Sequence, residues 1–181
     1  PEGRQESAPA RKPVHHQPEP ATTTSAVTTV ALEYGVSEDY IRGMLKAAHR
    51  PLIYAGGGVN NANAADELRG FADRFGIPVV TTLMGIGAID TRSPLSMRML
   101  GMHGAAFANY AVDDCDFLIT LGARFDDRVA GLPAKFAPNA KRIAHIDVDA
   151  SEINKVKRVQ WHHVGLLPPA LEALRAHGKQ Q

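Results

Sequence analysis

The feature that most constrains the fold is the short apolar run 117–121, which continues through Gly122 and Ala123 into Arg124. The run is unbroken rather than alternating, which is typical of a strand buried on both faces of a parallel sheet. Four charged residues follow within five positions, at 124, 126, 127 and 128. Ligands bind outside the carboxyl ends of strands in open α/β sheets, so the run predicts a charged ligand edge. A solvated loop with internal ion pairs is the alternative.

Strand-like and helix-like segments alternate along the rest of the chain. The expected strands are 51–55, 79–82, 117–121, 142–148 and 161–166. The expected helices are 37–49, one capped by Asn60 or Asn61 and ended by Gly76, 105–112, 150–158 and 168–177. No two strands are joined by a two-residue turn, so parallel crossovers are indicated. The sequence therefore predicts an α/β fold: a Rossmann-like, doubly wound parallel sheet of five to six strands with flanking helices.

The first thirty residues differ in composition from the rest. Five of the 12 prolines lie there, with few large apolar side chains. Such a segment buries too little surface to offset its ordering entropy. We therefore predict a disordered linker at 1–30 and one domain at 31–181. The chain does not begin with Met, so we expect it to be a piece of a longer protein.

Overall composition excludes several classes of protein. The formal net charge is +1, which gives no electrostatic footprint for nucleic acid. No apolar run approaches the ~20 residues of a membrane span. The single cysteine, Cys115, excludes an internal disulfide and fits a reducing cytoplasm. The His pairs at 15–16 and 162–163 lack nearby ligands to complete a set, so no metal site is predicted.

Small or charged residues follow each expected strand: Gly56-Gly57-Gly58, Thr82-Leu83-Met84-Gly85, Gly122-Ala123-Arg124, Asp147 and Gly165. Small residues admit a flat or diphosphate-bearing ligand close to the backbone, arginine can clamp a phosphate, and aspartate can accept from a ribose hydroxyl. The glycine turn lacks a third glycine and the later acidic residue, which disfavours a standard NAD site. Capping a helix near Ser151 is the alternative role for Asp147. His103 lies between glycines, which favours contact with a flat ring; a structural helix-terminus role is its alternative.

Six motifs, in this order, closely resemble the central domain of the large catalytic subunit of the acetohydroxyacid synthase (acetolactate synthase) family: PLIYAGGGV, TTLMGIGAID, PLSMRMLGMHG, ANYAVDDCD, LGARFDDRVAG and HIDVDASEINK. The similarity runs from about residue 40 to residue 160. That family depends on thiamine diphosphate, and its central domain is a six-stranded parallel sheet that binds FAD without net redox chemistry.

The resemblance implies a set of FAD contacts in this chain. They are Gly56, Gly57, Gly58, Thr82, Leu83, Met84, Leu100, Gly101, Met102, His103, Gly122, Ala123, Arg124, Asp126, Arg128, Val129 and Asp147. The resemblance further implies that Arg128 positions the carboxylate of the second 2-oxoacid, and that Met102 and Asp127 lie near the substrate channel. Guanidinium geometry suits such a carboxylate.

The resemblance also implies an activity that this chain cannot perform alone. It is a transferase reaction of branched-chain amino-acid biosynthesis: two 2-oxoacids, such as two pyruvates, condense to an acetohydroxyacid with loss of carbon dioxide. Thiamine diphosphate and Mg²⁺ would be bound by other domains of the catalytic subunit, with further copies and a small regulatory subunit as partners. The chain has Gly165-Leu166 where the family usually has Gly-Asp. The alternatives are a non-catalytic scaffold that has lost the cofactor, or the central domain of another thiamine-diphosphate carboligase.

Overall fold

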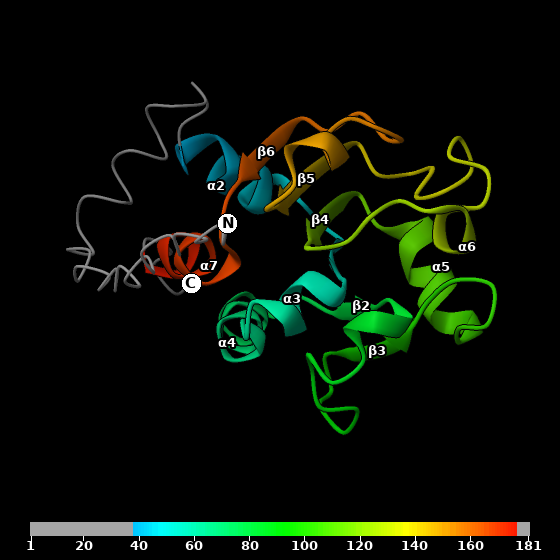
Figure 1. The fold of residues 1–181 in the computed structure, drawn as a ribbon, viewed down its shortest axis with the longest axis horizontal. Coiled ribbons are helices and arrows are strands. Elements are labelled where there is room, and N and C mark those ends of the chain that lie inside the picture. The colour runs from blue at the N-terminus through cyan, green and yellow to red at the C-terminus, as the bar shows by residue number, and fades with distance from the viewer. Residues whose placement is uncertain (1–37, 177–181) are drawn as a thin grey trace, which may run out of the picture.

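The computed structural model describes residues 38–176, so the predicted linker at 1–30 and the N-cap predicted at Ser37 lie outside the described residues. One six-stranded sheet organises this part of the chain, in the order β3-β2-β1-β4-β5-β6 (Figure 1). Every neighbouring pair is parallel. The strands are β1 (Pro51–Ala55), β2 (Val79–Thr81), β3 (Ser96–Met99), β4 (Phe117–Leu121), β5 (Arg142–Asp147) and β6 (Trp161–Val164). The predicted doubly wound parallel sheet is confirmed.

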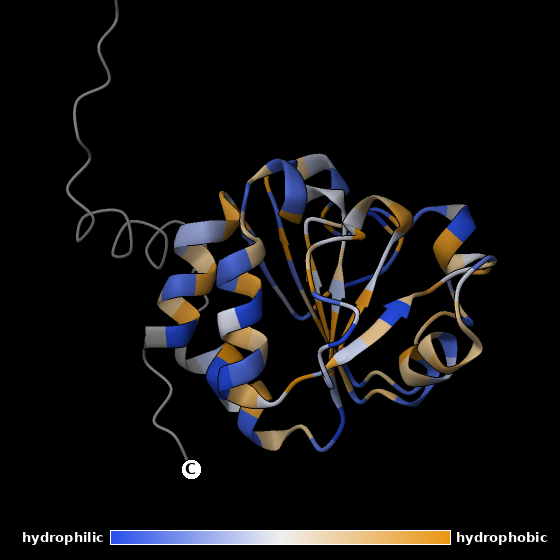
Figure 2. Ribbon diagram, turned by 90° about the horizontal axis from the view of Figure 1, so that it is seen from below, coloured by the Kyte–Doolittle hydropathy of each residue, from blue (hydrophilic) through white to orange (hydrophobic). Residues whose placement is uncertain are grey.

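Helices cover both faces of the sheet (Figures 1 and 2). They are α2 (Glu38–Ala47), α3 (Gly57–Asn61), α4 (Ala65–Phe75), α5 (Ala106–Asp114), α6 (Asp127–Ala130) and α7 (Leu167–Ala176), with 3-10 turns η1 (Leu83–Gly85) and η2 (Ala150–Glu152). Residues of α2, α4 and α7 pack on one face and residues of α5 on the other. Figure 2 shows the hydrophobic residues gathered in the strands between these layers.

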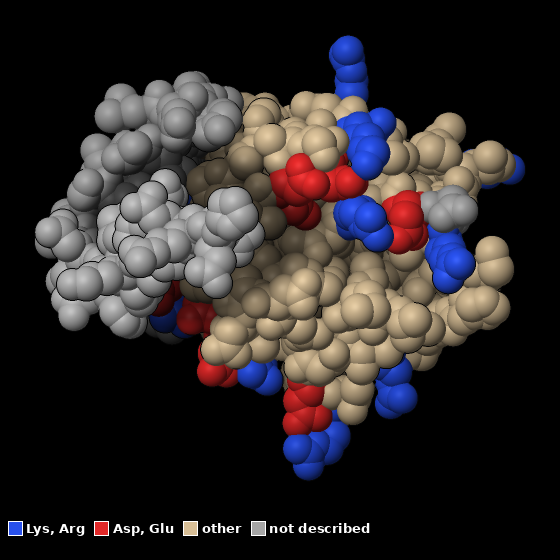
Figure 3. All heavy atoms as spheres, in the orientation of Figure 1, with Lys and Arg blue, Asp and Glu red and all other residues tan. Residues whose placement is uncertain are grey.

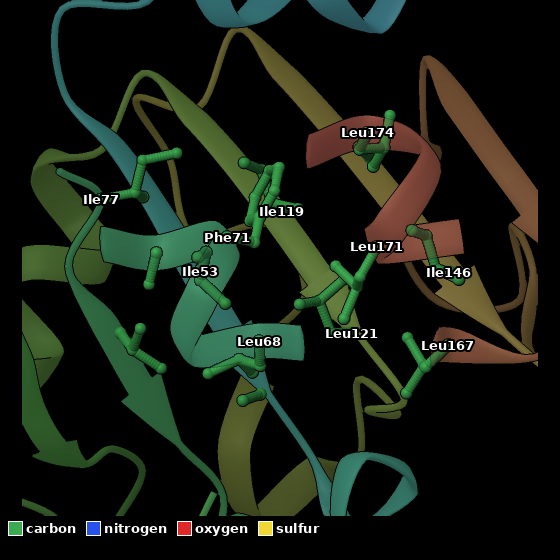
Figure 4. Packing of buried hydrophobic residues seen from close by; sticks show 14 of the residues in the cluster. Ile53, Leu68, Phe71, Ile77, Ile119, Leu121, Ile146, Leu167, Leu171 and Leu174 are labelled. Carbon is green, nitrogen blue, oxygen red and sulfur yellow. The ribbon is translucent and has the colours of Figure 1, made fainter. Parts of the chain in front are cut away.

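Side-chain alternation along the strands divides the interior into two cores, as the strand period of two requires. The first core joins Ile53, Ile119 and Ile146 to α2, α4 and α7. Figure 4 shows side chains of α4 and α7, among them Phe71 and Leu171, directed at the central strands. The second core contains the alternate strand residues together with residues of α5 and of the loop after β4. All five residues of β4 are buried, as predicted from its unbroken apolar run.

Two expected elements are wrong in detail. Neither Asn60 nor Asn61 caps a long helix: α3 has five residues, and α4 begins after Ala64 without a side-chain cap. The side-chain amide of Asn60 instead donates to the carbonyl oxygens of Met84 and Ile86, at 2.9 and 3.1 Å. The predicted helix 150–158 is only the turn η2, because Asn154 has φ +60° and its side chain accepts from the N–H of Val159.

The sixth strand, β3, matches none of the predicted strand segments. It lies at the edge of the sheet, is only partly buried and pairs irregularly with β2. Arg98 within it has φ +62°. β3 has the sequence SMRM, so this partly exposed edge strand lacks the unbroken apolar run that marks a buried strand.

Candidate functional site

The strand order creates a switch point between β1 and β4. From β1 the chain proceeds outward to β2 and β3, and from β4 it proceeds in the opposite direction to β5 and β6. Ligands of doubly wound sheets bind at the carboxyl ends of the strands at such a point. Figure 3 shows this face hollowed near its middle, with acidic and basic groups along one border and uncharged residues along the other.

Glycines allow the loops after β1 and β4 to lie backbone to backbone. The N–H of Gly56 donates to the carbonyl of Leu121, and the N–H of Gly58 to that of Gly122, both at 2.9 Å. A Cβ on Gly58 would lie 2.7 Å from the Cα of Gly122, which itself has φ +52°. These glycines therefore have a packing reason that holds with or without a ligand. Gly57 instead faces Met84, where a Cβ would lie 2.9 Å from the Cβ of that residue.

The loop after β2 packs against the glycine turn at 56–58. The hydroxyl of Thr82 accepts from the N–H of Gly85 at 3.0 Å, which starts η1. Asn60 of α3 holds the loop from its other side through the carbonyls already described. Leu83 and Met84 are left 69% and 72% exposed, so two large apolar side chains project from the carboxyl edge.

The loop after β3 is clamped by α5. The N–H of Gly101 donates to the side-chain oxygen of Asn109 at 2.8 Å, and the Asn109 amide donates back to the carbonyl of Gly101 at 3.1 Å. Leu100 is buried, whereas Met102 and His103 project from the loop and are exposed. Asn109 is a positioning residue that the sequence analysis did not identify; its only signal was a polar side chain on a largely apolar helix.

The loop after β4 presents charge on a buried aromatic anchor. Phe125 is buried between the exposed residues Arg124 and Asp126. Its ring centroid lies 5.8 Å from that of Tyr54 and 5.9 Å from that of Phe136. The Tyr54 hydroxyl donates to the carbonyl of Arg124 at 2.8 Å. Burial, together with the charge of Asp126, raises the pKa of Tyr54, which remains a neutral donor.

Arg128 comes close to the loop after β3 through its backbone. Its carbonyl accepts from the N–H of Met102 at 3.4 Å, so two residues predicted to share a channel do lie together. The carbonyl of Asp126 starts α6 by accepting from the N–H groups of Val129 and Ala130. Arg124 and Arg128 are both exposed, and neither guanidinium forms an ion pair with another described residue.

Asp147 lies at the end of β5, where one carboxylate oxygen accepts a hydrogen bond and the other faces an imidazole. Oδ1 accepts from the N–H of Asp149 at 3.0 Å, and Oδ2 lies 3.7 Å from Nε2 of His145. Burial opposes ionisation, but His145 and the Asp149 N–H outweigh it, so the pKa of Asp147 is lowered. Asp149 caps the following turn η2, because its side chain accepts from the N–H of Ser151. Each oxygen of Asp147 retains lone pairs for a further donor.

The edge beyond β6 is apolar at the position where the resembled family usually has an acid. Gly165 donates its N–H to the carbonyl of Asp147 at 2.9 Å, so the two strand ends are tied together. Leu166 is 62% exposed and adds no polar group. His162 and His163 project to opposite faces of β6, consistent with strand alternation, and His163 is buried.

Two classes of feature are missing between residues 38 and 176. No helix there is long and apolar enough to span a bilayer. No group of three or more His, Cys, Asp or Glu side chains there is placed to hold a metal ion.

Comparison with known proteins gives one family. The family model described as "Thiamine pyrophosphate enzyme, central domain" matches residues 39–174. The chain is 48% identical over 143 residues to an acetolactate synthase large subunit of Parasynechococcus marenigrum, an alignment of 79% of this chain and 21% of the relative. It is 46% identical over 143 residues to a probable chloroplastic acetolactate synthase 2 of Oryza sativa subsp. japonica, with the same coverage of 79% and 21%.

A third relative is the large subunit of acetolactate synthase isozyme 2 of Escherichia coli. Its identity is 43% over 144 residues, or 77% of this chain and 26% of the relative. The chain thus spans about a fifth to a quarter of the length of the curated relatives it matches.

Proposed function

The chain belongs to the family of thiamine pyrophosphate enzyme central domains, and on this premise we propose that it is the FAD-binding central domain of an acetolactate synthase large subunit. The reaction of the whole enzyme is the condensation of two 2-oxoacids, such as two pyruvates, with loss of carbon dioxide. Identities of 43 to 54% to acetolactate synthases support this assignment within the family.

One observation of the structure carries the proposal. Beside the switch point, Arg124 follows β4, with no ion pair to another described side chain, while the carboxylate of Asp147 ends the neighbouring strand β5. A phosphate clamp and a ribose acceptor on adjacent strand ends are what a dinucleotide requires.

The other residues of this edge also fit FAD. Leu83, Met84 and Met102 are 69%, 72% and 77% exposed, which gives a flat apolar ring a surface to lie against. A Cβ on Gly57 would crowd Met84, so glycine keeps this part of the edge open. The short helix α3 fits a cofactor that is not held by a standard NAD-type turn.

We assign roles accordingly. Arg124 would bind the diphosphate, Asp147 the ribose hydroxyls, and the loops 82–84 and 100–103 would flank the ring. In the resembled family the flavin undergoes no net oxidation or reduction, so the bound cofactor supplies shape and charge. Arg128, beside Met102, would position the carboxylate of a 2-oxoacid. The remaining predicted contacts, at Gly56, Gly58, Gly122, Ala123, Asp126 and Val129, would lie along the same edge.

Thiamine diphosphate and Mg²⁺ would be bound by other domains of the enzyme. We propose those domains, further copies of the subunit and a small regulatory subunit as partners, since several relatives bear the name "large subunit". We propose a reducing compartment: cytoplasm in a bacterium, or the chloroplast named for the rice relative. Burial, with the charges of Asp116 and Asp113, raises the pKa of the Cys115 thiol to about 12, so this cysteine stays protonated.

The experiment is a titration of the chain with FAD, followed by flavin fluorescence. We expect Arg124→Ala to weaken binding about tenfold to a hundredfold, because hydrogen bonds to charged groups contribute about 1.5–3 kcal/mol. Arg74→Ala, an equal charge change at an exposed position of α4, is the matched control. A folded chain that takes up no flavin at tens of micromolar would reject an autonomous site.

A scaffold that has lost its cofactor is the second candidate. Leu166 supports it, because an exposed leucine stands where the resembled family has an acid. The backbone contacts of Gly58 with Gly122 support it too, since they explain these glycines without a ligand. If neither Arg124→Ala nor Arg128→Ala changed flavin binding by the chain, the scaffold would be favoured. Another thiamine-diphosphate carboligase remains the third candidate and would differ in its choice of 2-oxoacid.

A further inference from the structure

His145 is the least satisfied polar side chain near the proposed site. It lies in the middle of β5, is 0% exposed, and neither Nδ1 nor Nε2 has a hydrogen-bond partner among the described residues. A neutral imidazole carries one donor and one acceptor, and burying both without partners is costly. An apolar side chain would serve the core better, so the imidazole calls for another explanation.

One side of the imidazole contacts the loop after β4. The ring of His145 lies edge-on to that of Phe125, with centroids 5.5 Å apart and an interplanar angle of 78°. Phe125 is the buried anchor between Arg124 and Asp126. Displacement of the His145 ring would therefore move the loop that carries the proposed phosphate clamp.

The opposite contact of His145 is with Asp147. The two residues are two positions apart on one strand and so project from the same face. Nε2 lies 3.7 Å from Oδ2, which is ion-pair distance but beyond a good hydrogen bond. Because Oδ1 is already held by the N–H of Asp149, the carboxylate has one orientation in which Oδ2 faces the imidazole.

His145 is thus in contact with both halves of the proposed site, one through Phe125 and the other directly. We propose that His145 is a positioning residue that holds the Asp147 carboxylate and the Arg124 loop in register, so that one dinucleotide can meet both. This role rests on the proposed function, because it presumes that Arg124 and Asp147 bind the same ligand. It adds a residue that the predicted set of FAD contacts does not contain.

The test compares two substitutions of His145 with one of its neighbour. His145→Phe keeps a flat ring against Phe125 but removes the nitrogen that faces Asp147, and His145→Gln restores a donor. Thr120→Val is the control, because Thr120 is the register partner of His145 on β4, is equally buried, and its hydroxyl has no hydrogen-bond partner among the described residues. The measurements are the FAD dissociation constant of the chain and the pKa of the Asp147 carboxyl by NMR.

We expect His145→Phe to raise the pKa of Asp147 and to weaken FAD binding about tenfold, the size of one lost charge-assisted contact. His145→Gln should restore most of the wild-type pKa of Asp147 and most of the FAD affinity, and Thr120→Val should change neither quantity. If His145→Phe matches Thr120→Val in both measurements, the proposal is overturned.

Two further outcomes separate this proposal from the proposed function. A wild-type chain that binds no FAD rejects the proposed function, and the pKa of Asp147 in the variants then decides the role of His145 alone. If His145→Phe does not fold, the wild-type chain decides: the NMR signals of the His145 ring should shift as Asp147 titrates. If the NMR signals of the His145 ring do not change during this titration, the proposal is overturned.

Discussion

The two faces of the sheet differ in the side chains that they bury and in what those side chains contact. The first core, on the side of α2, α4 and α7, is built mainly of large hydrophobic side chains, and the buried polar residues of this face, Thr81 and His163, lie on β2 and β6. The opposite face carries Tyr54, Thr120 and His145 in one row, because these residues are register partners on β1, β4 and β5. Tyr54 and His145 both contact the loop after β4. The first face is therefore mainly a source of stability, whereas polar residues of the opposite face contact the loop of the proposed site.

The largest test of this contrast is Ile119→Ala in the first core. Ile119 is 0% exposed on the central strand β4, and removing such a side chain costs about 2–5 kcal/mol. Urea unfolding followed by circular dichroism measures the loss. The FAD affinity of the molecules that remain folded should be unchanged; a parallel loss of affinity would break the division between the two faces.

For Tyr54→Phe we expect a smaller loss of stability than for Ile119→Ala, and a larger effect on FAD binding. The change removes the hydroxyl that donates to the carbonyl of Arg124 and costs about 0.5–1.5 kcal/mol. FAD binding should weaken about threefold to tenfold, because the loop loses a fixed point. Unfolding and flavin titration of the same preparation check both effects. Unchanged binding would show that Phe125 alone positions the loop.

The Asp147 carboxylate predicts an acid-dependent loss of stability that is smaller again. Its pKa is lowered in the folded chain, so its contribution is fully present above the unfolded pKa of about 4. That contribution disappears as the pH falls through the folded pKa. Urea unfolding between pH 6 and about pH 3 should show a shallower decline for Asp147→Asn than for the wild type. Identical slopes would contradict the lowered pKa.

The smallest expected change is that of Thr120→Val. The hydroxyl of Thr120 is buried and has no partner among residues 38–176, so replacing it by a methyl group relieves an unsatisfied oxygen. We expect a stabilisation of up to about 1 kcal/mol. A thermal melt measures it. A clear loss of stability would reveal a hydrogen-bonded role for this hydroxyl and would make the row of polar residues a connected network.

The sequence was sufficient for the elements that bury apolar surface. Residues 51–55 and 117–121 form strands with the predicted bounds, because each is an apolar run that favours burial and is of the length of a strand rather than a helix. β3 escaped prediction because an edge strand needs only one neighbour and little burial. The helix predicted at 150–158 failed because Asn154 adopts a left-handed conformation, which local propensity did not indicate.

The residues of the proposed site also fall into two groups, those that the sequence indicated and those that it did not. Small and charged residues at each strand end could be read directly along the chain, and they placed Arg124 and Asp147 among the candidates. Tyr54, Phe125 and His145 carried no such signal, since each reads as an ordinary strand or loop residue.

Five of the six strands and the chemistry at their ends could therefore be predicted from the chain itself, because both depend on neighbours along the sequence. Only the tertiary structure decided which ends meet. The strand order brings β1 beside β4, and the register places Thr120 between Tyr54 and His145. Long-range pairing of this kind follows from which hydrophobic faces bury one another, so no local stretch of sequence contains it.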